Sequence, residues 1–551
     1  MKKHRSKFAA LLLAASLAAG ISGADAYAEA SPEDYRLLKE EGTEAQGDGY
    51  RVEIAWCGEE GKRVFGRIYY PEDFDAAKKY TTVVLNHGGN VNADFWDKCY
   101  APELARQGYV CYAFDCRSAT EGGRGTYSDP TSTGEASVST YSEDLNAAMD
   151  LMLSKEYVDP ERLYLMGQSM GGATAQNVAA ARSDEVAGLI VLYGSLSEDN
   201  KAMLEDYDSV RENPYHNGEV LFIQGAQDAS LPIERTLDNM EWYEDSSIVY
   251  INTAYHGFGV QADRPAYICI ENVADYLERT GREGDEVQEL PSVSTEEDLL
   301  AEEEGYTMTG EKYSFTVHYC GEEGSRVFGR MYYPADFDPE KTYPTLILCH
   351  GGSGNADSQD KVYAPVLAEE GYLCYAIDCR SEASGGRGSY GDPTESGTAD
   401  VESYSGDLQA ALDYVKTLDY VNQGSIYLMG GSMGGATCQV TAAQRADEIA
   451  GMIILSGSLG DDIGEEMYAD YESVKEKPYD GEVLFVQGME DEQCILSRTL
   501  ENMQWYPLSS LTAISNMGHG YGYQMDRSAE MVVDNVKEFL YRTVNHIGET
   551  E

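Results

Sequence analysis

Serine, aspartate and histidine residues occur in this sequence in an order that can support nucleophilic catalysis. Ser169 lies in a Gly-x-Ser-x-Gly pattern, Asp228 follows an apolar run, and His256 precedes a glycine. A serine hydroxyl is a poor nucleophile at neutral pH, because it needs a base to take its proton and a carboxylate to orient that base. We therefore expect Ser169, Asp228 and His256 to form a catalytic triad.

The same three positions occur a second time in the chain. Ser432, Asp491 and His519 each stand 263 positions after their counterparts. A residue that is present in both copies of a site is a better candidate for a functional role than one present in either copy alone. We expect Ser432, Asp491 and His519 to form a second triad.

Acyl transfer also needs N–H donors for the negative charge that develops on the substrate oxygen. In a Gly-x-Ser-x-Gly turn the residue after the serine begins a helix, so its N–H can face that charge. Met170 and Met433 hold this position. Gly89 and Gly352, which end a repeated His-Gly-Gly pattern, are the expected second donors.

Structural alternatives exist for these assignments. The serine could lie in a glycine-rich turn as a helix cap, and Asp228 could also be an N-cap. Glu490 is a weaker candidate acid, because its counterpart in the first copy is Gln227. One further histidine pair recurs, His87 and His350, which open the His-Gly-Gly patterns. We expect these two to brace the loop.

Apolar runs alternate with helical patterns in each copy, and this alternation must position the candidate residues. Alternation of strands and helices predicts an α/β fold with a mostly parallel sheet and helices on both faces. Active sites on such sheets lie at the carboxyl ends of the strands, where all three triad positions fall. In the first copy the expected strands are 81–88, 109–116, 162–169, 186–194 and 219–225, and the expected helices are 141–156 and 171–183.

The repeat sets the expected domain organisation. A chain of 551 residues is too long for one core and suits two domains. We expect a signal peptide at 1–28, an acidic arm at 29–49, domain 1 at 50–280, an acidic linker at 281–312 and domain 2 at 313–551.

The N-terminal residues resemble a secretory signal. Lys2, Lys3 and Arg5 precede an apolar run from Phe8 to Ile21, and small residues follow at a spacing suited to cleavage. We expect the protein to be secreted, with the periplasm as an alternative location. No later run of about 20 apolar residues occurs, so no membrane association is expected after removal of the signal.

The charge of the chain limits its partners. A formal charge of −56, from 40 basic and 96 acidic residues, repels phosphate backbones, so we expect no nucleic-acid partner. No Cys/His spacing or calcium-loop pattern predicts a metal, and the triad chemistry needs no cofactor. We expect the eleven cysteines to be mainly buried free thiols.

With these motifs in place, each copy resembles an α/β-hydrolase. It is similar to the group that contains dienelactone hydrolases, cinnamoyl (feruloyl) esterases and prolyl oligopeptidase catalytic domains. The resemblance implies the eight-stranded fold and a Ser-Asp-His triad, but the fold supports many substrates. Met170 and Met433 stand where prolyl oligopeptidases usually have an aromatic residue. Only about twenty residues separate Leu196 from Glu219, which implies an open, shallow site.

The leading hypothesis is a secreted serine hydrolase that cleaves carboxylic esters through an acyl-enzyme in each domain. Acylated plant polysaccharides or feruloyl esters are the expected substrate class. A secreted peptidase of the prolyl oligopeptidase type is the alternative, and a second alternative makes one domain a non-catalytic binding module.

Candidate substrate contacts come from a repeated Gly-Gly-Arg-Gly pattern. Arg124 and Arg387 follow the fourth strand of each copy, where they could bind an anionic or polar substrate. The alternative is that each anchors its loop to a carboxylate such as Asp129 or Asp392.

Overall fold

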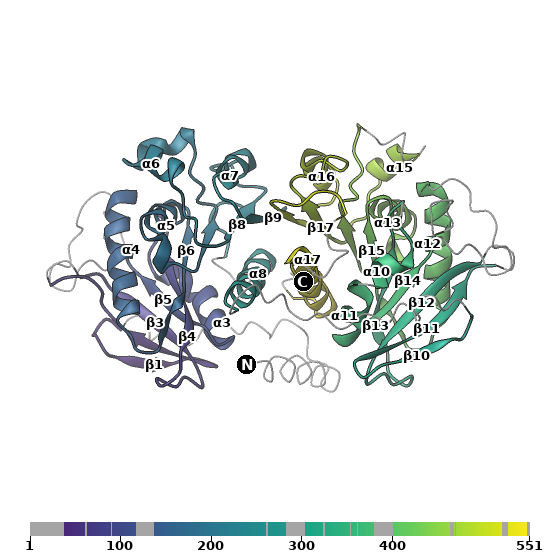
Figure 1. Ribbon diagram of the computed structural model, residues 1–551, viewed down its shortest axis with the longest axis horizontal. Coiled ribbons are helices and arrows are strands. Elements are labelled where there is room, and N and C mark those ends of the chain that lie inside the picture. The colour runs from purple at the N-terminus through teal and green to yellow at the C-terminus, as the bar shows by residue number, and fades with distance from the viewer. Residues whose placement is uncertain are drawn as a thin grey trace.

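The computed structural model of the protein contains two halves of the same build, which lie side by side (Figure 1). The expected signal peptide and the loops that carry Arg124 and Arg387 lie outside the described residues. The structure describes residues 38–60, 63–89, 91–116, 137–259, 263–282, 303–322, 326–352, 354–360, 362–379, 400–462, 468, 470–520 and 527–547.

The described residues of domain 1 form nine strands in the spatial order β1-β2-β3-β5-β4-β6-β7-β8-β9. The first three neighbour pairs are antiparallel and every later pair is parallel. The sheet is therefore mostly parallel, as the sequence predicts. The strands are β1 (Glu44–Gln46), β2 (Tyr50–Ile54), β3 (Gly66–Pro71), β4 (Tyr80–Asn86), β5 (Val110–Phe114), β6 (Val158–Gln168), β7 (Gly188–Leu192), β8 (Val220–Gly225) and β9 (Ser246–Ile251).

Domain 2 repeats this order as β10-β11-β12-β14-β13-β15-β16-β17-β18, with the same change from antiparallel to parallel pairing. Its strands are β10 (Thr307–Thr309), β11 (Tyr313–Cys320), β12 (Val327–Pro334), β13 (Tyr343–Cys349), β14 (Leu373–Ile377), β15 (Val421–Gly431), β16 (Gly451–Leu455), β17 (Glu482–Gly488) and β18 (Ser509–Ile514).

The two sheets join at their edges. Strand β9 pairs antiparallel with β18, from Ser510 opposite Ile251 to Ile514 opposite Ser247. In the part of the chain that the structure describes, the result is one continuous sheet of 18 strands that crosses the domain boundary. Neither β9 nor β18 is therefore left as an open edge, which would be a site for uncontrolled pairing.

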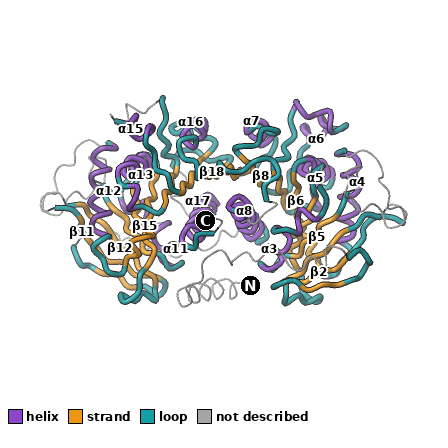
Figure 2. The backbone as a smooth tube through the Cα atoms, turned by 180° about the vertical axis from the view of Figure 1, so that it is seen from behind, coloured by secondary structure: helices purple, strands orange, loops and turns teal. Residues whose placement is uncertain are grey.

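Helices cover both faces of this sheet, and Figure 2 shows the strands of both halves between them. The helices of domain 1 are α2 (Asp94–Asp97), α3 (Tyr100–Arg106), α4 (Val138–Leu153), α5 (Met170–Ala181), η3 (Ser183–Glu185), η4 (Glu198–Met203), α6 (Tyr207–Glu212), α7 (Ile233–Met240) and α8 (Arg264–Thr280). Those of domain 2 are α10 (Ala356–Asp360), α11 (Tyr363–Glu369), α12 (Val401–Val415), α13 (Met433–Gln444), η5 (Ala446–Glu448), α15 (Tyr471–Glu476), α16 (Leu496–Met503) and α17 (Arg527–Val544).

The buried apolar side chains form separate cores on the two faces. On one face a single cluster runs through both domains and includes Leu145 of α4 and Leu408 of α12. On the other face, α3 and α8 pack in one cluster and α11 and α17 in another. Because both faces are covered, the central strands are buried at nearly every position, as β8 is at all six.

Two expected boundaries are wrong. Strand β1 lies inside the segment 29–49 that we expected to be a loose arm, and β10 lies inside the expected linker 281–312. Each pairs with the strand that follows it, so the described domains begin earlier than the sequence indicates. A three-residue strand among acidic residues has too little apolar pattern to be predicted.

All eleven cysteines are free and buried, which confirms the expectation. Burial raises the pKa of Cys57 and of Cys99 to about 12, so these thiols stay protonated and unreactive at neutral pH. Among the described residues, no helix has the length and apolar character that crossing a membrane requires.

Candidate active site

The candidate nucleophile of domain 1 lies in a strained turn between β6 and α5. Ser169 has φ 52° and ψ −123°, outside the regions that L-residues ordinarily occupy. The flanking glycines allow this turn to pack. A Cβ at Gly167 would stand 2.2 Å from the carbonyl oxygen of Gly171, and a Cβ at Gly171 would stand 2.2 Å from that of Asn86. The Gly-x-Ser-x-Gly pattern is therefore a steric requirement of this turn.

Three side chains of domain 1 form a continuous hydrogen-bonded chain. Ser169 Oγ lies 3.0 Å from His256 Nε2, and His256 Nδ1 lies 2.7 Å from Asp228 Oδ2. A proton on Nδ1 that is donated to Asp228 leaves Nε2 as the acceptor for the serine hydroxyl. This geometry suits the imidazole for removing the serine proton.

The acid of this chain is held in place by its own loop, after β8. Asp228 Oδ1 accepts hydrogen bonds from the backbone N–H groups of Ser230 at 2.8 Å and Leu231 at 2.9 Å. Gln224 donates from Nε2 to the carbonyl oxygen of Leu231 at 2.6 Å and lies 3.4 Å from Asp228 Oδ2. The carboxylate therefore caps the turn and orients the histidine at the same time.

Domain 2 repeats this arrangement after β15, β17 and β18. Ser432 has φ 53° and ψ −124°, and its Oγ lies 2.9 Å from His519 Nε2. His519 Nδ1 lies 2.8 Å from Asp491 Oδ2. Both copies thus bring together the three residues that the sequence predicted for them.

The carboxyl group of Asp491 is more acidic than an ordinary aspartate. Burial alone would raise its pKa, but hydrogen bonds from the Cys494 N–H and from His519 outweigh that penalty and lower it below 3.8. Asp491 is therefore ionised at neutral pH, as an acid that orients and stabilises an imidazolium must be.

The His-Gly-Gly loop lies directly against the nucleophile. A Cβ at Gly88 would stand 3.0 Å from the Ser169 Cβ, and a Cβ at Gly89 would stand 3.1 Å from the Met170 Cε. Met170 is the first residue of α5, where backbone N–H groups have no partner within the helix. Gly352 and Met433 lie together in the same way in domain 2. The expected oxyanion donors thus come from two elements that meet beside each serine.

His87 braces this loop, as the sequence suggested. Its Nε2 accepts the backbone N–H of Cys116 at 2.8 Å, so Nδ1 carries the proton that is donated to the Gly88 carbonyl at 2.7 Å. His350 makes the same two contacts in domain 2, at 3.0 and 2.7 Å. The ring is 1 % exposed at His87, which leaves His256 as the accessible base of domain 1.

Two contributors to the site were missed in the sequence. Gln224 and its counterpart Gln487 hold the loop of the acid, and Gln487 donates to the Cys494 carbonyl at 2.6 Å. Their signal was a Gln-Gly pair that ends the same strand in both copies. The second contributor is the residue after β7 or β16, which is Tyr193 in domain 1 and Ser456 in domain 2.

The fold and the site together define the class of protein. The strand order, the strained serine turn between strand and helix, and the order serine, aspartate, histidine are those of an α/β-hydrolase. A family model described as the alpha/beta hydrolase fold matches residues 81–219 and 344–474. The chain therefore carries the α/β-hydrolase fold in two tandem regions.

Individual relatives match parts of the chain. "Uncharacterized protein YcjY" of Escherichia coli K12 is 31% identical over 112 residues, which are 20% of this chain and 35% of that protein. "Dipeptidyl-peptidase 5" of Schizosaccharomyces pombe is 31% identical over 125 residues, which are 22% of this chain and 18% of that protein. The chain thus spans about a third or less of the length of these curated relatives.

A solved structure also matches a part of the chain about as long as one domain. Est1E from Butyrivibrio proteoclasticus, in a structure with bound ferulic acid, is 20% identical. The match covers 41% of this chain and 99% of Est1E, with a TM-score of 0.34.

Proposed function

We propose that both domains are serine hydrolases that cleave carboxylic esters through an acyl-enzyme. The observation that carries the proposal is the unbroken Ser–His–Asp chain, with distances of 3.0 and 2.7 Å in domain 1 and of 2.9 and 2.8 Å in domain 2.

The geometry supports the following sequence of steps in domain 1. His256 Nε2 takes the proton of Ser169 as Oγ attacks the ester carbonyl, while the N–H groups of Met170 and Gly89 stabilise the oxyanion. Collapse of the tetrahedral species breaks the bond to the alcohol, which leaves with the proton from His256. Water then attacks the acyl-serine with His256 again as base, and the carboxylic acid is released. Asp228 stabilises the imidazolium in both halves of the reaction.

An open site favours extracellular acylated polysaccharides or feruloyl esters as the substrate class. The His256 side chain is a third exposed. The connection from β7 to β8 caps this edge of the sheet. It contains two short helices, η4 and α6. Among the described residues, this connection therefore adds little structure at that edge, which favours access by an ester on a bulky polymer.

A panel of ester and amide substrates tests the reaction type. The Ser432→Ala and Ser169→Ala variants each leave one triad intact. We expect both to hydrolyse p-nitrophenyl acetate and methyl ferulate faster than aminoacyl-p-nitroanilides. The alternative, a secreted peptidase of the prolyl oligopeptidase type, requires the reverse order. The second alternative, a binding module, requires one of the two variants to be inactive towards every substrate.

We further propose that the protein is exported, because a basic start and an apolar run precede small residues suited to cleavage. Mass spectrometry of the protein from culture fluid and from the periplasm tests this proposal. A mature N-terminus near residue 28 is the expected result, and an intact Met1 on protein found only inside cells would contradict it.

A further inference from the structure

The strands at the domain boundary lead directly to the two histidines. Strand β9 ends at Ile251 and β18 ends at Ile514, so His256 and His519 follow within five residues of the paired edge. We use the name histidine segments for residues 252–259 and 515–520.

The first histidine segment begins with hydrogen bonds to the other domain. The backbone N–H of Asn252 donates to the Ser509 carbonyl at 3.0 Å. Its side-chain Nδ2 donates to the carbonyl oxygens of Met503 at 3.1 Å and Tyr506 at 2.8 Å. All three acceptors belong to domain 2, so the position of Asn252 is set by that domain.

Arg264, the first residue of α8, ties the same segment to domain 2 a second time. Its Nε and Nη2 donate to the two carboxylate oxygens of Glu482, each at 2.7 Å, and Nη2 also donates to the Leu508 carbonyl at 3.1 Å. Its Nη1 donates to Thr253 Oγ1 at 3.1 Å. One guanidinium therefore links a residue three positions before His256 to a buried carboxylate of the other domain.

The second histidine segment is held by domain 1 in the same way. The N–H of Ser515 donates to the Ser246 carbonyl at 3.0 Å, and Asn516 Nδ2 donates to the Glu244 carbonyl at 2.6 Å. Ser515 stands 263 positions after Asn252 in the repeat. The two domains therefore meet with approximate two-fold symmetry, in which each holds the other's segment.

The ion pairs repeat with the same symmetry. Arg527, the counterpart of Arg264, lies 2.7 Å from Glu219, the counterpart of Glu482. Glu219 also pairs with Arg279 of its own domain. Burial alone would raise the pKa of Glu219, but Arg279 and Arg527 outweigh it and lower the pKa to about 2. The carboxylate is thus charged at neutral pH and shared between the domains.

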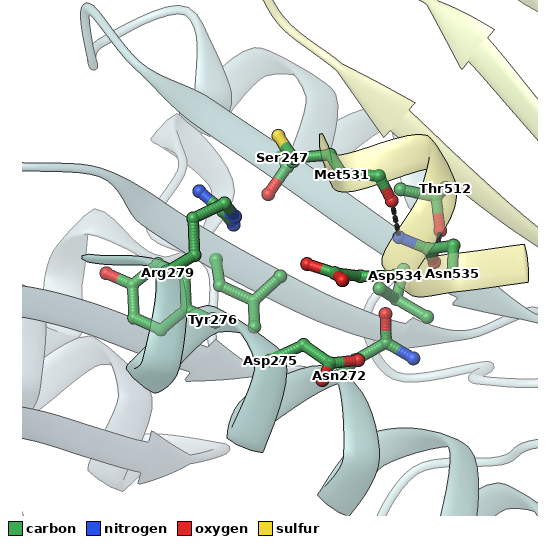
Figure 3. Close-up of a pocket in the computed structure, with 11 residues that line it drawn as sticks. Ser247, Asn272, Asp275, Tyr276, Arg279, Thr512, Met531, Asp534 and Asn535 are labelled. Atoms are coloured by element: carbon green, nitrogen blue, oxygen red, sulfur yellow. Dashed lines mark hydrogen bonds between the residues drawn. The ribbon is translucent and has the colours of Figure 1, made fainter. Parts of the chain in front are cut away.

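The helices behind the strand pair meet less closely. Figure 3 shows a pocket between α8 and α17, with Asn272 and Asp275 on one side and Asp534 and Asn535 on the other. None of the triad residues lines it. Direct ties between the domains lie at β9, β18 and the arginine–glutamate bridges beside the histidine segments, and Arg282, just after α8, adds an ion pair to Glu530 of α17.

We propose that each domain positions the catalytic histidine of the other. Glu482 and Asn252 are the positioning residues for the reaction at Ser169, and Glu219 is the positioning residue for the reaction at Ser432. The inference rests on the proposed function. It explains why two complete sites are held in one chain, since each histidine segment is anchored to a surface that only the other domain supplies.

The test measures domain 1 turnover after a change in domain 2. In the full-length Ser432→Ala background only Ser169 can react, and Glu482→Gln removes the charge that Arg264 binds from domain 1 and Arg542 binds from domain 2. We expect kcat for p-nitrophenyl acetate to fall about tenfold with KM little changed, because a small displacement of a catalytic base has effects of this size. Labelling of Ser169 by a fluorophosphonate should slow in proportion.

The matched control is Asp357→Asn in the same background. Asp357 is a carboxylate of domain 2 that pairs with a buried arginine of its own domain, Arg330 of β12, six strands away from β18. We expect it to leave kcat at Ser169 within about twofold, although it also removes a carboxylate charge bound to a buried arginine. An equal loss in both variants would mean that Glu482 acts only through the stability of domain 2, and would overturn the inference.

A second pair of variants applies if Glu482→Gln does not fold. Asn252→Ala in the Ser432→Ala background removes three side-chain hydrogen bonds to domain 2 and should lower kcat severalfold, whereas Asn516→Ala, which loosens only the other segment, should not. An unchanged kcat in Asn252→Ala would overturn the inference while the proposed function stands. A Ser432→Ala parent without turnover or labelling would overturn the proposed function for domain 1, and the inference with it.

Discussion

Tyr193 and Ser456 occupy the same position in the two domains, and both have a positive φ angle, of 35° and 45°. The Tyr193 ring packs edge-on against His256 with 5.0 Å between ring centroids, and its hydroxyl donates to the Phe258 carbonyl at 3.2 Å. Ser456 instead places a small, buried hydroxyl group at this position. The two triads thus share their geometry and differ in what surrounds it.

The Tyr193→Ser substitution should therefore affect domain 1 strongly. The ring is buried, so its removal leaves a cavity beside His256 and should lower the free energy of unfolding by about 3 kcal/mol. In the Ser432→Ala background kcat should fall more than KM rises. Denaturant unfolding and steady-state kinetics measure the two effects. Unchanged values of both would show that the ring does not support the histidine.

Asp228→Asn in the Ser432→Ala background tests the role of the acid. The amide keeps the shape of the side chain but can donate to His256 Nδ1, which stabilises the wrong tautomer. We expect kcat to fall about 10⁴-fold, as in other Ser-His-Asp triads, with an unchanged circular dichroism spectrum. A loss below about tenfold would indicate that another group orients the histidine.

The serine turn predicts opposite outcomes for two glycine substitutions. Gly171→Ala places a Cβ 2.2 Å from a backbone oxygen of Asn86, so it should unfold the turn and abolish labelling of Ser169. Gly406→Ala is the control, because Gly406 lies within α12 and a Cβ there meets nothing within 4 Å. It should raise the free energy of unfolding by about 0.5–1 kcal/mol. Thermal unfolding of the two variants distinguishes these expectations.

The bridging carboxylate Glu219 predicts an acid-dependent stability. Its pKa is lowered from 4.5 to about 2 in the folded chain, so it stabilises the fold fully above pH 4.5. This contribution, roughly 3 kcal/mol at most, is lost as the pH falls towards 2. Urea unfolding at pH 6, 4 and 3 should show a steeper loss for the natural protein than for Glu219→Gln. Parallel pH profiles for the two proteins would contradict the assignment.

The sequence predicted the triads because each structural requirement of a triad produces a recognisable local pattern of residues. A strained serine turn needs glycines on both sides, and the 263-residue repeat separated His256 and His519 from the histidines that occur once. The α/β alternation was equally visible, since strands covered on both faces are apolar at nearly every position, as in 219–225.

The pairing of β9 with β18 could not be predicted in the same way. An apolar strand such as 246–251 has the same sequence pattern whether its edge is covered by a helix or by another strand. The reason is that the backbone hydrogen bonds that join two sheets do not change the periodicity of the side chains. Glu219 and Glu482 did carry a signal, as charged residues that recur at the start of a buried strand.

Counting the reactive serines tests the central claim most directly. The full-length protein is treated with a fluorophosphonate, and the mass added to each chain is measured by intact mass spectrometry. We expect two labels per chain, one on Ser169 and one on Ser432, and a single label in each of Ser169→Ala and Ser432→Ala. One label in the natural protein would show that one triad does not activate its serine, and none would contradict the account for both domains.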